Sequence, residues 1–248
     1  MSEELPLIVE TGKVSKPKYG LLAFPDTGLV GTIAVGHMIR SKKMNEVGYV
    51  RLSALPPILV IHDGEPKSPV RLYGNDDLVV LISETPLPFE TYKELAEQTV
   101  RWAGEKGIEL LISLAGIAVQ NREEIDRPQV FGIGASAEVR DLLKSRGFSL
   151  LEEGFIAGPQ ALLLDACIEK TFPLAVLLAQ SHSKFPDPVA AVSMLQDLNQ
   201  AFGLDVDVKT LQEQAEEFRI RLRELMQRTQ QSMQGTKSQE AELPALYG

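Results

Sequence analysis

Two glycine-rich turns are the parts of this sequence best suited to binding a small anion. Phe24–Thr32 reads FPDTGLVGT, and Phe131–Ala137 reads FGIGASA. Each lies between a strand-like run and a helical pattern, so backbone N–H groups at the helix start could face a phosphate. The first turn lacks the Lys-Ser/Thr ending of a P-loop, and neither has G-x-G-x-x-G spacing. We interpret the first as tight strand–helix packing with Asp26 or Thr27 as a cap, and Ser136 in the second as a first-turn residue.

The histidines and the single cysteine do not form a recognisable reactive set. His37 lies in a helical pattern, His62 ends a strand-like run, and His182 stands between two serines. No pair of them has the spacing of metal ligands. Cys167 lies on the apolar side of a predicted helix, which favours a buried, unreactive thiol. The sequence thus predicts neither a metal site nor a cofactor.

A nucleophile–base–acid set can be assembled only from distant parts of the chain. Ser181 or Ser183 would have to combine with a distant histidine and with Asp187, and no G-x-S-x-G nucleophile elbow supports this. We therefore expect that the protein is not an enzyme and that its function resides in a surface that contacts a partner.

The end of the sequence carries a pattern suited to such contact. Leu246, Tyr247 and Gly248 place a hydrophobic residue, a tyrosine and the final residue in order. Capture of a terminal carboxylate is a known recognition mode, and tyrosine is a preferred interface anchor. By composition alone such an ending arises in roughly one chain in a hundred, so a frayed end without function is the alternative. The polar stretch 230–240 predicts a disordered tether, and Ala241–Gly248 turns apolar again.

Composition limits the class of partner and the cellular setting. The 248 residues carry a formal net charge of -9, which argues against nucleic acid and anionic membrane as partners. A hydrophobic content of 44% suffices for a sizeable core. The most apolar stretch, Ala161–Gln180, contains charged residues and a proline, so it does not predict a membrane span. With one cysteine and an acidic start that lacks a signal-peptide pattern, we expect a cytoplasmic protein.

Alternating strand-like and helix-like segments predict the fold class. The expected strands are Leu5–Val9, Tyr19–Phe24, Val47–Leu52, Ile58–His62, Val70–Tyr73, Leu78–Ser83, Ile108–Leu114, Val130–Ile133 and Leu174–Ala179. The expected helices are Leu29–Arg40, Pro88–Glu105, Ala135–Ser145, Pro159–Lys170, Pro188–Phe202 and Val208–Gln231. Near-continuous apolar runs favour strands buried on both faces. The alternation favours an α/β sandwich with a mixed, mostly parallel sheet and helices on both faces.

We expect three segments along the chain. A core domain covers residues 1–205, an amphipathic C-terminal helix covers 206–231, and a flexible tail covers 232–248. Apolar residues recur in the last helix at alternating spacings of three and four. We favour packing of this face on its own domain, with contact between copies in an oligomer as the alternative.

Four stretches resemble the proteasome assembly chaperone family, in its archaeal and bacterial branch. They are Phe24-Pro25-x-x-Gly28-Leu29-Val30-Gly31, Leu114-Ala115-Gly116, Gly154–Leu163 (GFIAGPQALL) and Phe185–Ala191 (FPDPVAA). They occur in order within Leu5–Phe218, and the last two are the more specific. The resemblance implies a three-layer α/β/α fold similar to nucleoside phosphorylases, without an established catalytic site. It also implies a homo-oligomer that binds α subunits of the 20S proteasome.

The resemblance further implies a role for the last three residues, although many family members lack this ending. Leu246 would fill an apolar slot between α-ring subunits, and Tyr247 would pack there and hydrogen-bond through its hydroxyl. The carboxylate of Gly248 would pair with a pocket lysine, which is a charge-assisted contact. The expected function is therefore that of an assembly chaperone or of an ATP-independent proteasome regulator.

Two other functions remain as alternatives. The first is a phosphorylase-like or hydrolase-like enzyme that uses both glycine turns, and an ordered anion between the turns would favour it. The second is an oligomeric scaffold unrelated to the proteasome.

Overall fold

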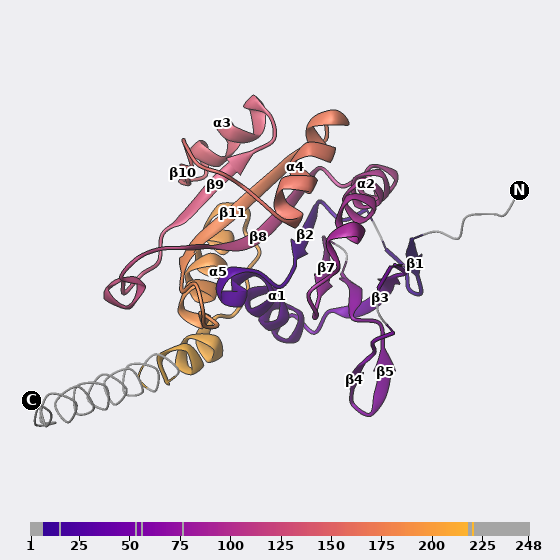
Figure 1. Ribbon diagram of the computed structural model, residues 1–248, viewed down its shortest axis with the longest axis horizontal. Helices are drawn as coiled ribbons and strands as arrows, with labels where there is room; N and C mark the ends of the chain where they lie inside the picture. Colours follow the sequence, from indigo (N-terminus) through magenta and orange to yellow (C-terminus); the bar gives the residue numbers. More distant parts are fainter. Residues whose placement is uncertain are drawn as a thin grey trace, which may run out of the picture.

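A central β-sheet with helices on both faces forms the body of the protein, as the computed structural model shows (Figure 1). The structure describes residues 7–14, 16–52, 54, 55, 57–75, 77–217 and 220. The strands are β1 (Ile8–Glu10), β2 (Tyr19–Ala23), β3 (Asn45–Val50), β4 (Val60–His62), β5 (Glu65–Lys67), β6 (Val70–Gly74), β7 (Leu78–Ser83), β8 (Leu110–Ala118), β9 (Val130–Gly134), β10 (Ser149–Leu150) and β11 (Leu174–Ser181). The helices are α1 (Val30–Ser41), α2 (Phe89–Lys106), α3 (Ala137–Ser145), α4 (Pro159–Glu169) and α5 (Pro188–Phe202), with 3-10 turns η1 (Thr27–Leu29) and η2 (Arg122–Glu124).

The sheet is parallel at its centre and antiparallel toward its flanks. Its order is β1-β3-β6-β7-β2-β8-β11-β9-β10. Strands β7, β2, β8 and β11 run parallel to one another, whereas β1, β3, β6 and β7 are joined by antiparallel pairs. On the other flank β9 runs antiparallel to β11, and the short β10 is parallel to β9. The expected mixed sheet with a mostly parallel centre is confirmed.

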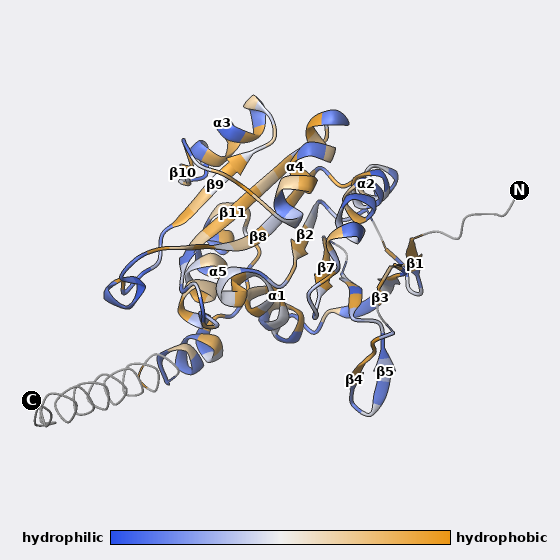
Figure 2. Cartoon of the chain, in the orientation of Figure 1, coloured by the Kyte–Doolittle hydropathy of each residue, from blue (hydrophilic) through white to orange (hydrophobic). Residues whose placement is uncertain are grey.

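Side chains that alternate along the central strands supply two separate cores. Leu21, Ile112 and Leu177 pack in the core that α1, α3 and α5 cover. Their sequence neighbours Leu22 and Leu111 pack on the opposite face, beneath α2 and α4. Figure 2 shows the central strands as hydrophobic and the helices as mixed, which is typical of strands buried on both faces between amphipathic helices. The expected three-layer α/β/α arrangement is therefore confirmed.

A small hairpin of β4 and β5 projects from the antiparallel flank (Figure 1). Three large apolar side chains on or near β4 are exposed: Ile58, Leu59 and Ile61. β5 has the sequence Glu-Pro-Lys, and such residues have low strand propensity. It was not expected from the sequence, and neither was the two-residue β10.

The start of the last helix packs on its own domain. Residues 209–217 are helical. Leu211 and Ala215 are buried in the core with α1 and α5, together with Val206 just before the helix. This favours packing on the domain for that portion. The rest of the expected helix to residue 231, apart from residue 220, and the expected tail 232–248 lie outside the described residues.

No helix within the described ranges combines the length and apolar character that a membrane crossing requires.

Candidate functional site at the carboxyl ends of the central strands

The loops that follow the four parallel strands meet at one edge of the sheet, called here the carboxyl edge. It comprises the turn after β2, the end of β8 with η2, the loop after β11 and the start of α2 after β7. In open α/β sheets, ligands bind beyond the carboxyl ends of the strands. This edge is therefore the first place to look for a site.

Close backbone contacts lock the β2 turn against the end of β8. The Gly116 N–H donates to Asp26 Oδ2 at 2.7 Å. A Cβ on Gly31 would lie 2.1 Å from Leu114 O, and a Cβ on Gly116 would lie 2.1 Å from Thr27 O. The glycines therefore serve tight strand–helix packing, as expected from the sequence. The expectation that Asp26 or Thr27 acts as a cap is wrong, because no side chain makes a capping bond at the start of η1 or of α1. The Asp26 side chain reaches β8 instead.

Asp187 connects the loops after β2, β8 and β11. Its Oδ1 accepts hydrogen bonds from Ala190 N (3.0 Å), which caps α5, and from Arg122 Nη2 (3.1 Å). Its Oδ2 accepts from His182 N (3.1 Å) and lies 2.8 Å from Arg122 Nε. The Asp187 N–H donates to Gly28 O at 2.7 Å. The side chains of Arg122 and Asp187 are only 4% and 2% exposed, so this ion pair is shielded from water.

The serine–histidine–aspartate set considered from the sequence is not assembled here. The Ser181 hydroxyl is buried and donates to the backbone oxygen of His182 at 3.3 Å. Gly28 has a φ of 68°, and a Cβ on it would lie 1.8 Å from Ser181 Oγ. Asp187 is engaged by Arg122 instead of by a histidine side chain. These groups position backbone and do not form a nucleophilic centre.

The Asp26 carboxyl group is electrostatically unusual. Burial raises its pKa from 3.8 to about 7, and this outweighs the lowering effect of nearby backbone N–H groups, chiefly that of Gly116. The carboxyl group thus gains or loses a proton near neutral pH while it holds two strands together. The carboxyl edge therefore holds both the Asp26 carboxyl group and the buried ion pair of Arg122 and Asp187.

The two glycine turns lie at opposite ends of the sheet. Gly28 abuts Ser181 at the end of β11, whereas Gly134 pairs with Ala175 near the start of β11, because β9 is antiparallel. Six residues of strand separate the two points by about 20 Å. A Cβ on Gly134 would meet Arg140 N at 2.7 Å, so this turn is also filled by its own helix. One small anion therefore cannot lie between both turns.

The remaining candidate reactive residues have structural environments. His37 lies in α1 with Nε2 2.5 Å from Asp207 O, and Ser136 caps α3 by accepting from Val139 N. Cys167 is fully buried, and burial raises its pKa to about 12, as suits an unreactive thiol. Among the residues that the structure describes, no group of three His, Cys, Asp or Glu side chains could hold a metal ion.

A second buried arginine lies on the antiparallel flank. Arg71 on β6 pairs with Glu46 (3.4 Å from Nη1) and, through Nη2, with Glu84. Glu84 also lies 2.8 Å from Nε2 of His62, which ties the β4–β5 hairpin to the sheet. The ring of Tyr73 faces the guanidinium, 5.3 Å from its carbon. The Arg71 side chain is 3% exposed, but Glu46 and Glu84 are 28% and 24% exposed.

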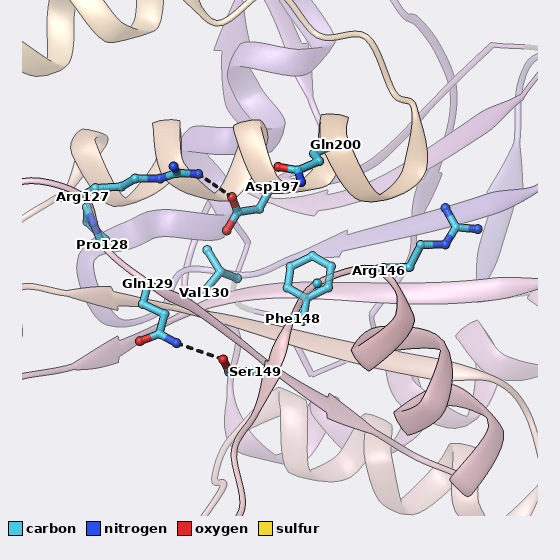
Figure 3. A pocket seen from close by; sticks show the side chains of 10 residues that line it. Arg127, Pro128, Gln129, Val130, Arg146, Phe148, Ser149, Asp197 and Gln200 are labelled. Atoms are coloured by element: carbon cyan, nitrogen blue, oxygen red, sulfur yellow. Dashed lines mark hydrogen bonds and ion pairs between the residues drawn. The ribbon is translucent and has the colours of Figure 1, made fainter.

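A cavity of about 330 Å³ lies between α5, the start of β9 and the end of α3 (Figure 3). Arg127 Nη2 pairs with Asp197 Oδ1 at 3.1 Å, and Gln129 Nε2 donates to Ser149 Oγ at 3.1 Å. Figure 3 shows the Arg146 side chain directed away from these pairs. Because the facing polar groups already bond to one another, a charged ligand would have to displace the ion pair of Arg127 and Asp197. We therefore do not assign function to this cavity.

The residues expected to bind a partner, Leu246, Tyr247 and Gly248, lie outside the described residues. Sequence reasoning also missed the pairing of Arg122 with Asp187. The one available signal was Asp187 itself, placed before Pro188 at the start of a helix, where aspartate is a favoured cap.

Comparison with known proteins identifies a family model and a relative that match most of the chain. A model described as PAC2 family matches residues 20–226. A curated but uncharacterized protein of Methanocaldococcus jannaschii is 33% identical over 203 residues, which are 82% of this chain and 83% of that protein.

Solved structures give the same grouping. Pyrococcus furiosus PbaA, titled an archaeal homolog of proteasome-assembly chaperone, is 30% identical with a TM-score of 0.78, over 91% of this chain and 99% of that one. A monoclinic crystal form of PbaA gives 29% identity and a TM-score of 0.80, over 95% and 99% of the chains. Pyrococcus furiosus PbaB, titled an archaeal proteasome activator, is 23% identical with a TM-score of 0.75, over 88% and 98% of the chains, and shows the shared fold alone.

Proposed function

This chain belongs to the PAC2 family, and we propose on that premise that it is a proteasome assembly chaperone or ATP-independent regulator that binds the α ring of the 20S proteasome. The observation that carries the proposal is the likeness to PbaA over nearly the whole length of both chains. The packed glycine turns agree with a binding role, since they leave no shared anion site.

The contact that we propose is made by Leu246, Tyr247 and Gly248. Leu246 fills an apolar slot between neighbouring α subunits, Tyr247 packs beside it and hydrogen-bonds through its hydroxyl, and the Gly248 carboxylate pairs with a lysine. A three-residue anchor binds weakly by itself, because ordering of the preceding segment offsets part of the contact free energy.

We also propose that the protein acts as a homo-oligomer. Several anchors on one particle would raise the overall affinity by about 10²–10⁴ if their spacing matched the pockets of the ring. The number of copies is therefore part of the binding mechanism.

The test is deletion of Leu246–Gly248, with Tyr247→Ala as the single-residue version. Both should weaken binding to purified α rings at least tenfold in surface plasmon resonance, while circular dichroism and particle size stay unchanged. Ser238→Ala, in the polar stretch before the anchor, is the matched control and should bind like the wild type. Equal binding by the truncated and full-length proteins would contradict docking through this segment.

A fluorogenic peptide assay separates the two roles. A gate-opening regulator should accelerate peptide hydrolysis by the assembled 20S particle, whereas an assembly chaperone should instead raise the yield of rings from separate α subunits.

A further inference from the structure

The β4–β5 hairpin is a two-stranded ribbon whose two outer edges differ in character. Within the described residues, β4 and β5 pair only with each other, so each strand has one free edge. β4 has the sequence Val-Ile-His and β5 the sequence Glu-Pro-Lys. Figure 2 shows β4 as largely hydrophobic and β5 as hydrophilic. An isolated two-stranded ribbon is only marginally stable in water, and an unprotected edge can pair with a further strand.

The turn of the hairpin determines which backbone groups face outward. Asp63 and Gly64 have φ angles of 51° and 80°, as a two-residue type I′ turn requires. The residue pair that flanks such a turn is hydrogen-bonded, so the next pair, Ile61 and Pro66, directs its backbone groups away from the ribbon. On β5 this position is a proline, which has no N–H to donate. On β4 it is an isoleucine, whose N–H and C=O can both bond to another strand.

The exposed apolar side chains of β4 border a cavity. Leu59 and Ile61 are 64% and 63% exposed, and residues two apart in a strand point to the same face. Leu59 lines a cavity of about 680 Å³ at the base of the hairpin, together with Pro66, the cross-strand partner of Ile61. The opposite face is anchored to the sheet, because His62 Nε2 lies 2.8 Å from Glu84 Oε2. The apolar face of β4 is therefore open, while the ribbon itself is held in place.

Two charged side chains of this region have no counter-charge. Arg51 is exposed at the rim of the cavity and donates to Tyr49 Oη at 3.3 Å, but it pairs with no carboxylate among the described residues. Glu46, which also lines the cavity, pairs with Arg71. Asp63, exposed in the turn at the far end of the hairpin, has no cationic partner in the same part of the chain. The unpaired positive group thus lies at the base and the unpaired negative group at the tip.

We propose that two copies of this chain associate through the free edge of β4, by antiparallel pairing about a two-fold axis into a four-stranded sheet. With the pairing centred on Val60, Ile61 of each copy lies opposite Leu59 of the other, and the outward backbone groups bond across the axis. The two apolar faces then form one strip. This inference rests on the proposed homo-oligomer and names one of its contacts, and it requires no contact with the proteasome.

The same pairing brings the unpaired charges together. Asp63 of one copy lies opposite Pro57 of the other, and Pro57 lines the cavity that carries Arg51 at its rim. Each end of the contact therefore gains a charge-assisted pair. An unrelated peptide would need its own alternation of apolar residues and a carboxylate at the right distance. A second copy supplies both, because base and tip of the hairpin carry opposite charges.

The main test measures particle mass by size-exclusion chromatography with light scattering over a range of concentrations. Ile61→Lys places like charges on both sides of the axis, as protected edge strands do, and should shift dissociation to about tenfold higher concentration or more. The matched control is Ile168→Lys, at a residue of α4 that is 60% exposed, and its mass should equal that of the wild type. Hydrogen exchange of the Ile61 amide should be slower in the assembled particle than after dissociation by dilution.

A double-mutant cycle tests the charged pair. Arg51→Gln and Asp63→Asn, the second of which suits the type I′ turn, should each weaken association about two- to fivefold. The double variant should be no weaker than either single variant, because both changes remove the same contact. Additive losses would overturn the pairing of these two groups across the axis.

The outcomes separate this inference from the proposed function. If Ile61→Lys kept the mass and dissociation of the wild type, or if the wild-type particle held an odd number of copies, the two-fold contact would be overturned. A wild type that is monomeric at every concentration would overturn the homo-oligomer together with the contact. If Ile61→Lys dissociated as expected while the wild type did not bind α rings, the proteasome role would fall and the β4 contact would stand.

Discussion

The two buried arginines of this protein hold different parts of the sheet in different ways. Arg122, at the carboxyl edge, pairs with Asp187, whose side chain is 2% exposed and also caps α5. Arg71, on the antiparallel flank, pairs with Glu46 and Glu84, both of which reach water. If Asp187 were lost, water could not reach Arg122 to solvate its charge. If one partner of Arg71 were lost, the other carboxylate would remain, and both carboxylates reach water.

The difference shows where the fold tolerates little change. A buried ion pair contributes modestly when intact, but removal of one partner leaves an uncompensated buried charge. A pair with partly exposed members is screened and weaker. We infer that the carboxyl edge is the rigid part of the molecule and that the antiparallel flank with its hairpin is the more adaptable part.

Neutralising one carboxylate at each arginine is the strongest test of this comparison. Asp187→Asn should lower the free energy of unfolding by about 3–5 kcal/mol, since Arg122 is left buried without a counter-charge. Glu46→Gln, the matched change at Arg71, should cost less than about 1 kcal/mol, because Glu84 remains and the site is screened. Urea denaturation with circular dichroism measures both. Similar losses for the two variants would erase the distinction between the regions.

A pair of glycine variants tests whether the close packing of α1 against the sheet is confined to Gly31 or extends to Gly36. Gly31→Ala should destabilise by about 1–3 kcal/mol, because its Cβ would meet Leu114 O at 2.1 Å and force the helix from the sheet. Gly36→Ala, whose nearest neighbour would be an Arg40 side-chain nitrogen at 3.6 Å, should stabilise by up to about 1 kcal/mol through helix propensity. Thermal unfolding of the two variants checks the opposite signs. If the Gly31→Ala protein were as stable as the wild type, α1 would be able to move away from β8 at little cost in free energy.

The pH dependence of stability gives a separate test of the carboxyl edge, through Asp26. Because the folded state raises the pKa of Asp26 from 3.8 to about 7, it retains a proton that the unfolded chain releases. The free energy of unfolding should therefore fall as pH rises from about 4 to 7, by at most about 1.4 kcal/mol per pH unit from this group. Denaturation of wild type and Asp26→Asn across that range isolates the contribution. Parallel pH profiles of the two proteins would show that Asp26 does not titrate in this way.

Local sequence patterns were enough to predict most of the elements and the layered fold. Continuous apolar runs such as Leu78–Ser83 became buried central strands, and Pro188–Phe202 is a helix with the predicted bounds. Such elements can be predicted because the hydrophobic period and the capping residues lie within the segment itself. β5 was missed because its Glu-Pro-Lys sequence resembles a loop, and β10 because two residues show no period.

Long-range pairing could not be predicted. Nothing near β9 indicates that it inserts antiparallel beside β11, and this insertion sends the second glycine turn to the far end of the sheet. Arg122 lies in a polar stretch that looks like solvated surface, and its partner is 65 residues away.

The strand order also has a consequence for how the newly made chain acquires its shape. β2 stays unpaired on one side until residue 118 has left the ribosome, and β8 waits for β11, which ends at Ser181. In the N-terminal half, β3, β6 and β7 and the β4–β5 hairpin pair between segments close in sequence. They should form earliest, since short loops close at lower entropic cost. The centre of the sheet then forms late, when three-quarters of the polypeptide is already synthesised.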